Sequence, residues 1–384
     1  MGDEAPPSPR EEVMTSGLLP PGGGTPGKFH AHFDCFSGAA GDMILAACLD
    51  AAEDTNALLD LVQDRLREGL PEISKDFRIS ISRVQRGKMA SIAALHVNVH
   101  SRFAHLPAPV PRATTKPSAI HSQDHHHGHT HDHDHHHDAH NHSHHHEHSH
   151  SHRDDSVVDR EDDGHGDHDP LVHVQAQDNN HSHTSSLQTG PLRNLPQIRS
   201  MLEASSPQYI DPWVRDTAIE VFTELANAEA ETHGVEGSDA VHFHEVGAID
   251  SIVDTIGSLI ALHELGVGSI SCSRLPIGEG TCWGMHGLMP VPAPATLRLL
   301  EGMAVCEGPA GVTGELVTPT GASLLRVLTK RFREAGHMPG RPPPFTIRYI
   351  GHGAGTKDFE RHPNIVRLLL GDDVEWKVKN IHDI

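Results

Sequence analysis

The chain has 384 residues and a formal net charge of −22, because 52 Asp and Glu outnumber 30 Lys and Arg. This acidic balance argues against a general nucleic-acid binder, whose affinity comes largely from cations that neutralise phosphates. No run approaches the ~20 apolar residues that cross a bilayer, so we expect no membrane-spanning protein and no membrane partner.

The cysteines and the N-terminus bear on the cellular compartment. The five cysteines form no CxxC pair, and an odd number in a chain of this length indicates reduced thiols and a cytoplasmic location. Residues 1–27 are rich in Pro, Gly and acid and lack an apolar run. We therefore expect them to be a disordered extension rather than a signal peptide.

The first ordered part is expected over residues 28–100. Apolar residues at alternate positions predict strands, and apolar residues at helical spacing predict helices. The expected elements are a strand at 29–33, helices at 43–52 and 56–69, and strands at 77–81 and 92–99. A glycine-bearing turn at 34–42 joins the first strand to the first helix.

Residues 101–190 show no usable periodicity and are expected to be a disordered insertion, because they cannot bury enough apolar surface to offset their ordering entropy. The tract from His121 to His152 holds 18 of the 37 His. Such tracts are typical of metal binding, and imidazole suits nickel, copper and zinc. The alternative is a linker that ignores metal. The predicted metal ligands of the tract are His125, His126, His127, His135, His136, His137, His144, His145 and His146.

Order is expected to resume over residues 191–371, followed by a tail at 372–384. The expected helices are 195–204, 212–232, 250–265, 294–300 and 319–332, and the expected strands are 241–246, 270–275, 345–350 and 365–370. Strands that alternate with helices predict an α/β or mixed α+β fold. We therefore expect a single core domain interrupted by the long His-rich insertion.

The segment from His242 to Asp254 is the strongest candidate for a functional site. His242 and His244 would share one face of a strand and could form half of a metal site. Asp250 and Asp254 are four residues apart, so they share one face of the next helix. The structural alternative is a helix-capping Asp, a surface Asp and two partly buried His. Because these residues lie on consecutive elements, the functional interpretation is favoured.

Two glycine-bearing loops each precede a helix, and such loops can aim N–H groups at a phosphate or carboxylate. The first runs from Asp34 to Asp42 and lacks the Gly-Lys-Ser/Thr element of a Walker A loop. The second runs from Thr313 to Gly321. On spacing alone, the first loop is better interpreted as a tight turn, and the second is either a helix cap or a site for an anionic ligand.

In combination, these motifs resemble the LarC family of nickel insertion proteins. The matching stretches appear in the family's order and run from Phe33 to about Gly371. They are residues 33–38 with 41–43, 242–248 with 250–254, 286–287 with 290–296, 314–321, and 353–356 with 363–364. A His-rich insertion after the first strands is also common in that family. Each motif alone is unspecific, whereas the ordered set is highly specific.

The resemblance implies a nickel chelatase, a lyase-type metal insertion enzyme. Family members insert Ni²⁺ into pyridinium-3,5-bisthiocarboxylic acid mononucleotide, in a CTP-dependent step that uses Mg²⁺ or Mn²⁺. The implied catalytic residues are Asp250, Asp254 and Glu245, and the implied metal ligands outside the tract are His242 and His244. The implied substrate- and nucleotide-facing residues are Asp34, Ser37, Gly38, Gly41, Asp42, Thr318, Thr320 and Gly321.

Full-length members of this family continue into a C-terminal ferredoxin-like portion, which residues 372–384 do not match. We therefore expect either a separately encoded partner with that portion or a homo-oligomer. Two alternatives to the enzyme stay open. One is a non-enzymatic nickel store or metallochaperone that acts through the tract, and the other is a scaffold that is indifferent to metal.

Overall fold

The computed structural model describes residues 28–89, 91–103, 192–241, 243, 248–284 and 287–373. All of these residues belong to one compact unit. The described part of the chain breaks off at Phe103 and resumes at Leu192. The core is a mixed α+β fold with an insertion at 104–191, as the sequence predicts. The N-terminal extension, the His tract and the C-terminal tail from residue 374 lie outside the described residues.

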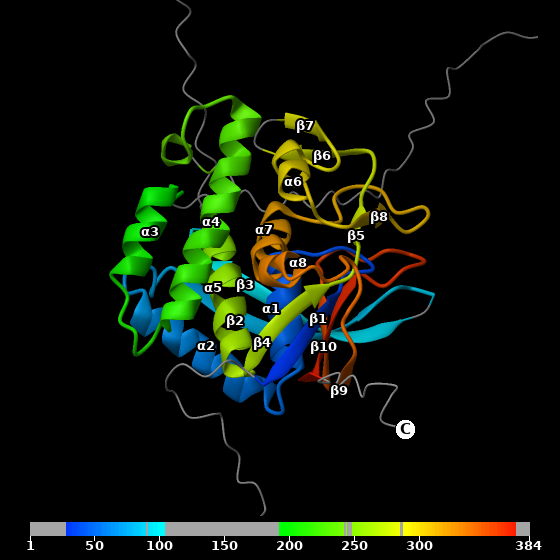
Figure 1. Ribbon diagram of the computed structural model, residues 1–384, viewed down its shortest axis with the longest axis horizontal. Coiled ribbons are helices and arrows are strands. Elements are labelled where there is room, and N and C mark those ends of the chain that lie inside the picture. The colour runs from blue at the N-terminus through cyan, green and yellow to red at the C-terminus, as the bar shows by residue number, and fades with distance from the viewer. Residues whose placement is uncertain are drawn as a thin grey trace, which may run out of the picture. The chain divides into compact units, whose positions relative to one another are not determined.

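Helices and strands follow one another along the whole core (Figure 1). The helices are α1 (Gly41–Asp50), α2 (Thr55–Gly69), α3 (Leu195–Glu203), α4 (Pro212–His233), α5 (Ile249–Glu264), α6 (Pro294–Leu299), α7 (Pro319–Leu328) and α8 (Lys330–Glu334), with a short 3₁₀ turn at Ser238–Ala240. The strands are β1 (Phe29–Asp34), β2 (Phe77–Arg86), β3 (Ile92–Ser101), β4 (Val267–Cys272), β5 (Leu275–Ile277), β6 (Thr281–Gly284), β7 (Gly287–Pro290), β8 (Val305–Glu307), β9 (Phe345–Ala354) and β10 (Ile365–Asp373).

The main sheet joins segments from both sides of the insertion. Its strand order is β2-β3-β9-β10-β1-β4. The first strand, β1, runs antiparallel to β10 on one side and parallel to β4 on the other, as Figure 1 shows. Two small sheets pair β5 with β8 and β6 with β7. Since β9 is also antiparallel to β10, β1 and β9 point the same way, and the loops that follow them meet at one edge.

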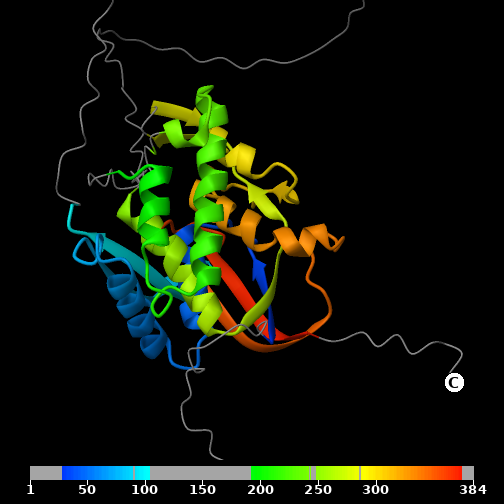
Figure 2. The ribbon, with the colours of Figure 1, turned by 60° about the vertical axis from the view of Figure 1, so that its left-hand side comes forward.

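Helix α1 lies directly on the sheet and organises the core. A β-carbon on Gly353 would lie 1.9 Å from the Met43 carbonyl oxygen, and one on Gly351 would lie 1.9 Å from the Ala47 carbonyl oxygen. Glycine at these two positions therefore lets α1 approach the backbone of β9. Helix α5 packs against α1, and α4 packs against α5, so both cover the same face of the sheet (Figure 2).

Local capping explains where several helices begin. The Asp211 side chain accepts a hydrogen bond from the Trp213 N–H at 2.8 Å, and Pro212 occupies the first helical position of α4. Asn194 and Gln197 form a capping box at the start of α3. These starts agree with the elements predicted for this part of the sequence.

Some predicted boundaries are wrong. The helix predicted at 319–332 is divided at Thr329, whose hydroxyl donates to the Leu325 carbonyl at 2.7 Å and so competes with the regular helical pattern. The strand predicted at 270–275 is two strands. Ser273 still donates to the Phe33 carbonyl, whereas Leu275 donates to the Ala304 carbonyl, because the chain changes partner between them.

The strand predicted at 241–246 is not confirmed. Most of it lies outside the described residues, and the two described positions, Val241 and Phe243, are buried but belong to no strand.

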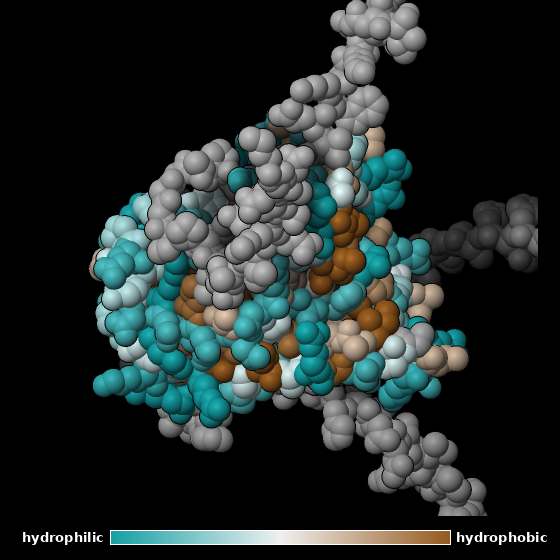
Figure 3. All heavy atoms as spheres, turned by 90° about the horizontal axis from the view of Figure 1, so that it is seen from below, coloured by the Kyte–Doolittle hydropathy of each residue, from teal (hydrophilic) through white to brown (hydrophobic). Residues whose placement is uncertain are grey.

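The described surface carries scattered apolar side chains. Figure 3 shows small apolar patches among hydrophilic side chains on the face seen from below. Isolated exposed apolar side chains are normal for a globular protein. In the described residues, no helix is long and apolar enough to span a bilayer.

Candidate functional site

Three helices begin around one point. A β-carbon on Gly41, the first residue of α1, would lie 2.9 Å from Cβ of Asp254 and 2.9 Å from Cγ2 of Thr320. Asp254 is on α5, and Thr320 is the second residue of α7. The first turns of α1 and α7 and the second turn of α5 therefore lie side by side.

Three carboxylates gather at these helix starts. Asp42 and Asp250 are each the second residue of their helix, and Asp254 follows one turn later on α5. All three are partly buried. Asp254 interacts electrostatically with both Asp42 and Asp250. The structure thus brings Asp42, which the sequence places in the first glycine loop, next to the acidic pair predicted on the later helix.

Burial sets the protonation of this acidic cluster, which comprises Asp42, Asp250 and Asp254. Burial raises the pKa of Asp42 to about 6 and the negative charge of Asp250 adds to this, although the Met43 N–H donates to Asp42 Oδ1 at 2.8 Å and opposes the shift. Burial, followed by the charges of Asp42 and Asp250, raises the pKa of Asp254 well above its usual range. Asp254 Oδ1 is buried and has no hydrogen-bond partner among the described residues.

This arrangement favours a cation. Carboxylate oxygens are the ligands that Mg²⁺ and Mn²⁺ prefer, and a bound cation would remove the electrostatic cost of gathering three negative charges. Within the described ranges, however, no three His, Cys, Asp or Glu side chains are already arranged to hold a metal ion.

The two glycine loops predicted from the sequence are bound to each other. Ala39 donates to the Leu316 carbonyl, and Thr318 donates to the Ala39 carbonyl, both at 3.0 Å. A β-carbon on Gly38 would lie only 2.0 Å from the Leu316 carbonyl oxygen, and one on Gly321 would lie 2.4 Å from the Ala39 carbonyl oxygen. The glycines at these positions therefore allow the close approach of two backbones.

Three polar residues of these loops make contacts within the protein. Asp34, at the end of β1, forms an ion pair with Arg367 at 2.9 Å from Nε. The Ser37 hydroxyl donates to the Pro363 carbonyl at 2.6 Å. The Thr318 hydroxyl accepts the Gly321 N–H at 3.2 Å and caps α7. The first two contacts join the end of β1 and the loop after it to β10 and to the segment around Pro363, and the third lies within the start of α7.

Two cations lie in the same region and were not predicted from the sequence. Arg86 donates from Nε to the Gly355 carbonyl at 2.8 Å, and Lys357 donates to the Glu315 carbonyl at 2.7 Å. Burial lowers the pKa of Lys357. Both residues lie beside glycine-bearing turns. The sequence predicts such turns, but it does not show that they approach α1 and α7.

Several predicted site residues cannot be placed. His242, His244 and Glu245 lie outside the described residues, as do His286 and every His of the tract. Phe243, between the two histidines, is buried. The predicted pairing of these histidines with Asp250 and Asp254 stays a prediction.

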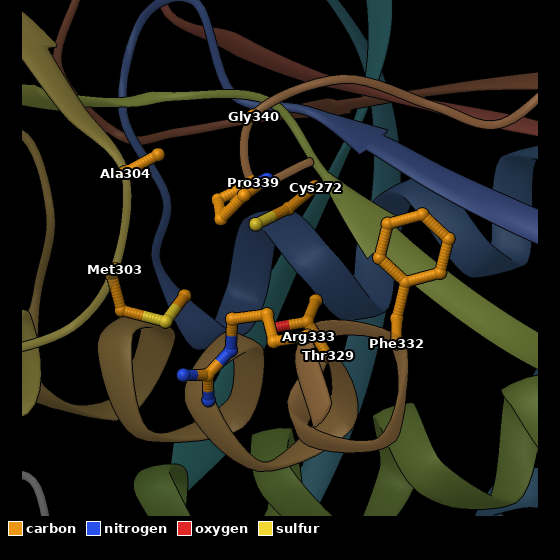
Figure 4. A pocket seen from close by; sticks show the side chains of 8 residues that line it. All are labelled: Cys272, Met303, Ala304, Thr329, Phe332, Arg333, Pro339 and Gly340. Atoms are coloured by element: carbon orange, nitrogen blue, oxygen red, sulfur yellow. The ribbon is translucent and has the colours of Figure 1, made fainter. Parts of the chain in front are cut away.

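Two hollows of the described surface lie away from the acidic cluster. A cavity of about 10 Å³ is lined by Cys272, Met303, Phe332 and Arg333, among others (Figure 4). It has room for about one water. Burial raises the pKa of Cys272 to about 12, so this thiol stays protonated at neutral pH. An open groove of about 580 Å³ runs along α6 and shares no lining residue with the acidic cluster.

Comparison with known proteins shows a match to one protein family. The sequence pattern of the family described as "Nickel insertion protein" matches residues 31–383. Proteins named "Putative nickel insertion protein" from Geotalea daltonii and Geobacter metallireducens are 45% and 46% identical over 188 and 182 residues. These matches cover 49% and 47% of this chain, and 45% and 43% of the relatives.

A protein of the same name from Acaryochloris marina is 32% identical over 353 residues, which is 92% of this chain and 62% of that relative. The chain thus spans between about two fifths and three fifths of these relatives. No solved structure matches it.

Proposed function

This chain belongs to the nickel insertion protein family, and we propose that it inserts nickel into a small organic acceptor at the acidic cluster. One observation carries the choice of site: Asp42, Asp250 and Asp254 converge where α1, α5 and α7 begin. Nickel is the substrate metal that the family name gives.

The acceptor we propose is pyridinium-3,5-bisthiocarboxylic acid mononucleotide, which the resemblance to LarC proteins implies. Its sulfur atoms are softer ligands than carboxylate or water, so they suit nickel better than the surrounding oxygens do. Transfer of nickel from oxygen ligands to sulfur is therefore favourable. The product would be the nickel-pincer nucleotide cofactor, formed by a lyase-type chelatase.

We assign the CTP-dependent part of the reaction to the same region. The acidic cluster fits Mg²⁺ or Mn²⁺, since its donors are carboxylates and Asp254 Oδ1 has no hydrogen-bond partner among the described residues. When bound, that cation would neutralise phosphate charge. In this proposal the loops at Gly38–Asp42 and Thr318–Gly321 face phosphates or carboxylates. Backbone N–H groups at the nearby helix starts would bind these anions.

Nickel delivery falls to residues that precede α5. His244 is six residues from Asp250, so an extended chain limits their separation to about 20 Å. We propose that His242, His244 and Glu245 receive nickel and pass it to the acceptor beside Asp250 and Asp254. The tract from His121 to His152 would raise the local nickel concentration.

A direct test uses the full chain. The purified protein is incubated with Ni²⁺, CTP, Mg²⁺ and the bisthiocarboxylate mononucleotide, and the nickel-containing product is detected by its mass. We expect product in the complete mixture and none without protein or CTP. If nickel binds and no product forms, the second candidate, a nickel store, is supported. That candidate rests on the 18 His of the tract.

A further inference from the structure

The tip of the β2–β3 hairpin is fastened to the loop that follows β9. The Gly87 N–H donates to Asp358 Oδ1 at 2.8 Å, and the Met89 N–H donates to the Glu360 carbonyl at 3.3 Å. These two contacts hold Arg86, the last residue of β2, against the loop that follows β9.

The guanidinium of Arg86 is held through two of its three nitrogen atoms, Nε and Nη1. Its Nε donates to the Gly355 carbonyl at 2.8 Å and its Nη1 to the Gln85 carbonyl at 3.3 Å. Nη2 makes no hydrogen bond to the described part of the chain. An arginine has five N–H donors in a planar fork, so several of them remain available to a ligand.

Arg86 lies next to the acidic cluster. A β-carbon on Gly355, whose carbonyl anchors Arg86, would lie 2.9 Å from Met43 Sδ. Met43 directly follows Asp42, and the positive charge of Arg86 is felt at the Asp42 carboxylate. The region therefore combines three carboxylates with the anchored guanidinium of Arg86, in addition to the ammonium of Lys357.

His96 is a second polar group near Arg86. Its Nε2 is buried and has no hydrogen-bond partner among the described residues. Burial, and then the charge of Arg86, lower the pKa of His96, so its ring is neutral at pH 7. A buried polar atom without a partner is costly unless a ligand or water satisfies it.

We propose that Arg86 is an anion-binding residue of this site, which holds an oxyanion of the acceptor while the acidic cluster faces the metal. This inference rests on the proposed function. An acceptor with a phosphate and two acidic ring substituents would be repelled by three carboxylates alone. A guanidinium fork matches phosphate and carboxylate geometry and offsets that repulsion. The ligand class is therefore a small molecule with a metal-binding group and a separate oxyanion.

The test measures binding without nickel. Calorimetry with Mg²⁺ present uses two probes: pyridinium-3,5-biscarboxylic acid mononucleotide, in which oxygen replaces sulfur, and the nucleoside that lacks its phosphate. Arg86→Gln is expected to weaken binding of the mononucleotide by about tenfold or more, and Arg86→Lys is expected to weaken it less.

The two probes separate the sources of the oxyanion. If Arg86 holds the phosphate, the wild type and Arg86→Gln bind the nucleoside equally. If it holds a ring carboxylate, both probes are weakened. The matched control is Arg83→Gln, because Arg83 lies on the same strand and pairs with Asp50 at 2.5 Å, at the other end of α1. It should bind as the wild type does.

Two results would overturn the proposal for Arg86. The first is a folded Arg86→Gln protein, with unchanged circular dichroism and thermal midpoint, that binds both probes as tightly as the wild type. The second is a wild type that binds neither probe. Failure of the proposed function gives a different result from failure of this inference. The wild type would then bind the biscarboxylic acid mononucleotide but form no nickel-containing product from the bisthiocarboxylate.

Discussion

Gly41 and Asp254 are in contact across two helices that the sequence separates by more than 200 residues. A β-carbon on Gly41 would lie 2.9 Å from Cβ of Asp254 and 3.2 Å from its Oδ2. The absence of a side chain at Gly41 therefore lets the start of α1 reach the carboxylate on α5. This contact is what places Asp42 beside Asp250 and Asp254.

Gly41→Ala is expected to separate α1 from α5. The added methyl group has no room, because Asp254 lies on one side and Thr320 on the other. Overpacking of this kind lowers the free energy of unfolding by about 1–3 kcal/mol. Nickel insertion should fall by more than the loss of folded protein explains, because the acidic cluster is displaced. Both quantities are measured on one preparation, by chemical denaturation and by product mass.

Gly257→Ala is the matched control on α5. A β-carbon there would lie 3.4 Å from side-chain atoms of Leu45 and Val62, which is close to ordinary contact. Alanine is favoured over glycine in a helix interior by up to about 1 kcal/mol. Stability should therefore stay the same or rise, and insertion should be unchanged. Equal loss of insertion in both variants would argue against a special role for Gly41.

Asp254→Asn separates function from folding. Burial raises the pKa of Asp254 well above its usual range, so the ionised carboxylate destabilises the folded state at pH 7. The amide keeps the shape and removes that cost. We expect equal or greater stability and at least about tenfold less insertion, with overall nickel binding near normal. Asp250→Asn should also lose insertion.

The control for these variants is Asp216→Asn. Asp216 is exposed on α4 and pairs with Arg215 at the surface. Its loss should change neither insertion nor stability by more than about 0.5 kcal/mol. Wild-type insertion by Asp254→Asn would remove the acidic cluster from the mechanism.

Local sequence signals predict the helices well, because their causes are local. Asp211 and Pro212 mark the start of α4 in the sequence and cap it in the structure. Asp250 and Asp254 are predicted to share a helix face, and both interact at the start of α5. These features depend on neighbours within one or two turns, which a sequence displays directly.

The approach of Asp42 to that pair was not predicted, because it depends on contacts distant in the chain. Nothing near Asp42 in sequence shows that Gly41 faces Asp254. Arg86 was missed for the same reason, since its anchor is Gly355. Ser37 is expected to face a ligand, and that role stays a prediction; in the structure its hydroxyl donates to the Pro363 carbonyl. A short polar side chain in a loop can contact a ligand or form a hydrogen bond within the protein. The sequence does not distinguish these two roles.

His32 gives the protein a predictable response to acid. It is buried on β1, where Nδ1 and the Ser271 hydroxyl are 2.8 Å apart. Burial lowers its pKa from 6.5 to about 4, and the charge of Asp34 opposes the shift. Between these values the unfolded chain takes up a proton that the folded chain does not. His32 alone should therefore lower the free energy of unfolding by about 3 kcal/mol as the pH drops from 6.5 to 4. Asp42 and Asp254, whose pKa values are raised, contribute in the opposite direction over this range.

His32→Asn isolates this contribution, because asparagine keeps a polar atom near the position of Nδ1. Denaturation curves of both proteins at several pH values should show that the free energy of unfolding of the variant, relative to the wild type, rises by about 3 kcal/mol as the pH drops from 6.5 to 4. His100→Asn is the control, since His100 is exposed on β3 and bonded to Ser80. If the His32 variant and the wild type lose stability in parallel, His32 does not govern this response.

Replacement of residues 104–191 by a short Gly/Ser linker tests the division of labour between tract and core. Both flanks have their own anchors, because Phe77 pairs with Ser101 in the sheet and Asn194 caps α3. The thermal midpoint should therefore stay unchanged, while the nickel bound per chain falls sharply. Insertion at saturating nickel should persist and should slow only when nickel is scarce, since the tract raises local concentration without shaping the site.

A second variant keeps the length of the insertion and removes the ligands of the tract, through Asn at all 18 His from His121 to His152, the nine predicted ligands included. It should behave like the shortened protein. In the unaltered chain, the rate at scarce nickel should fall below about pH 6.5, because protons compete with nickel for imidazole. Loss of insertion at saturating nickel in both variants would instead show that insertion requires the tract and would contradict the division of labour proposed here.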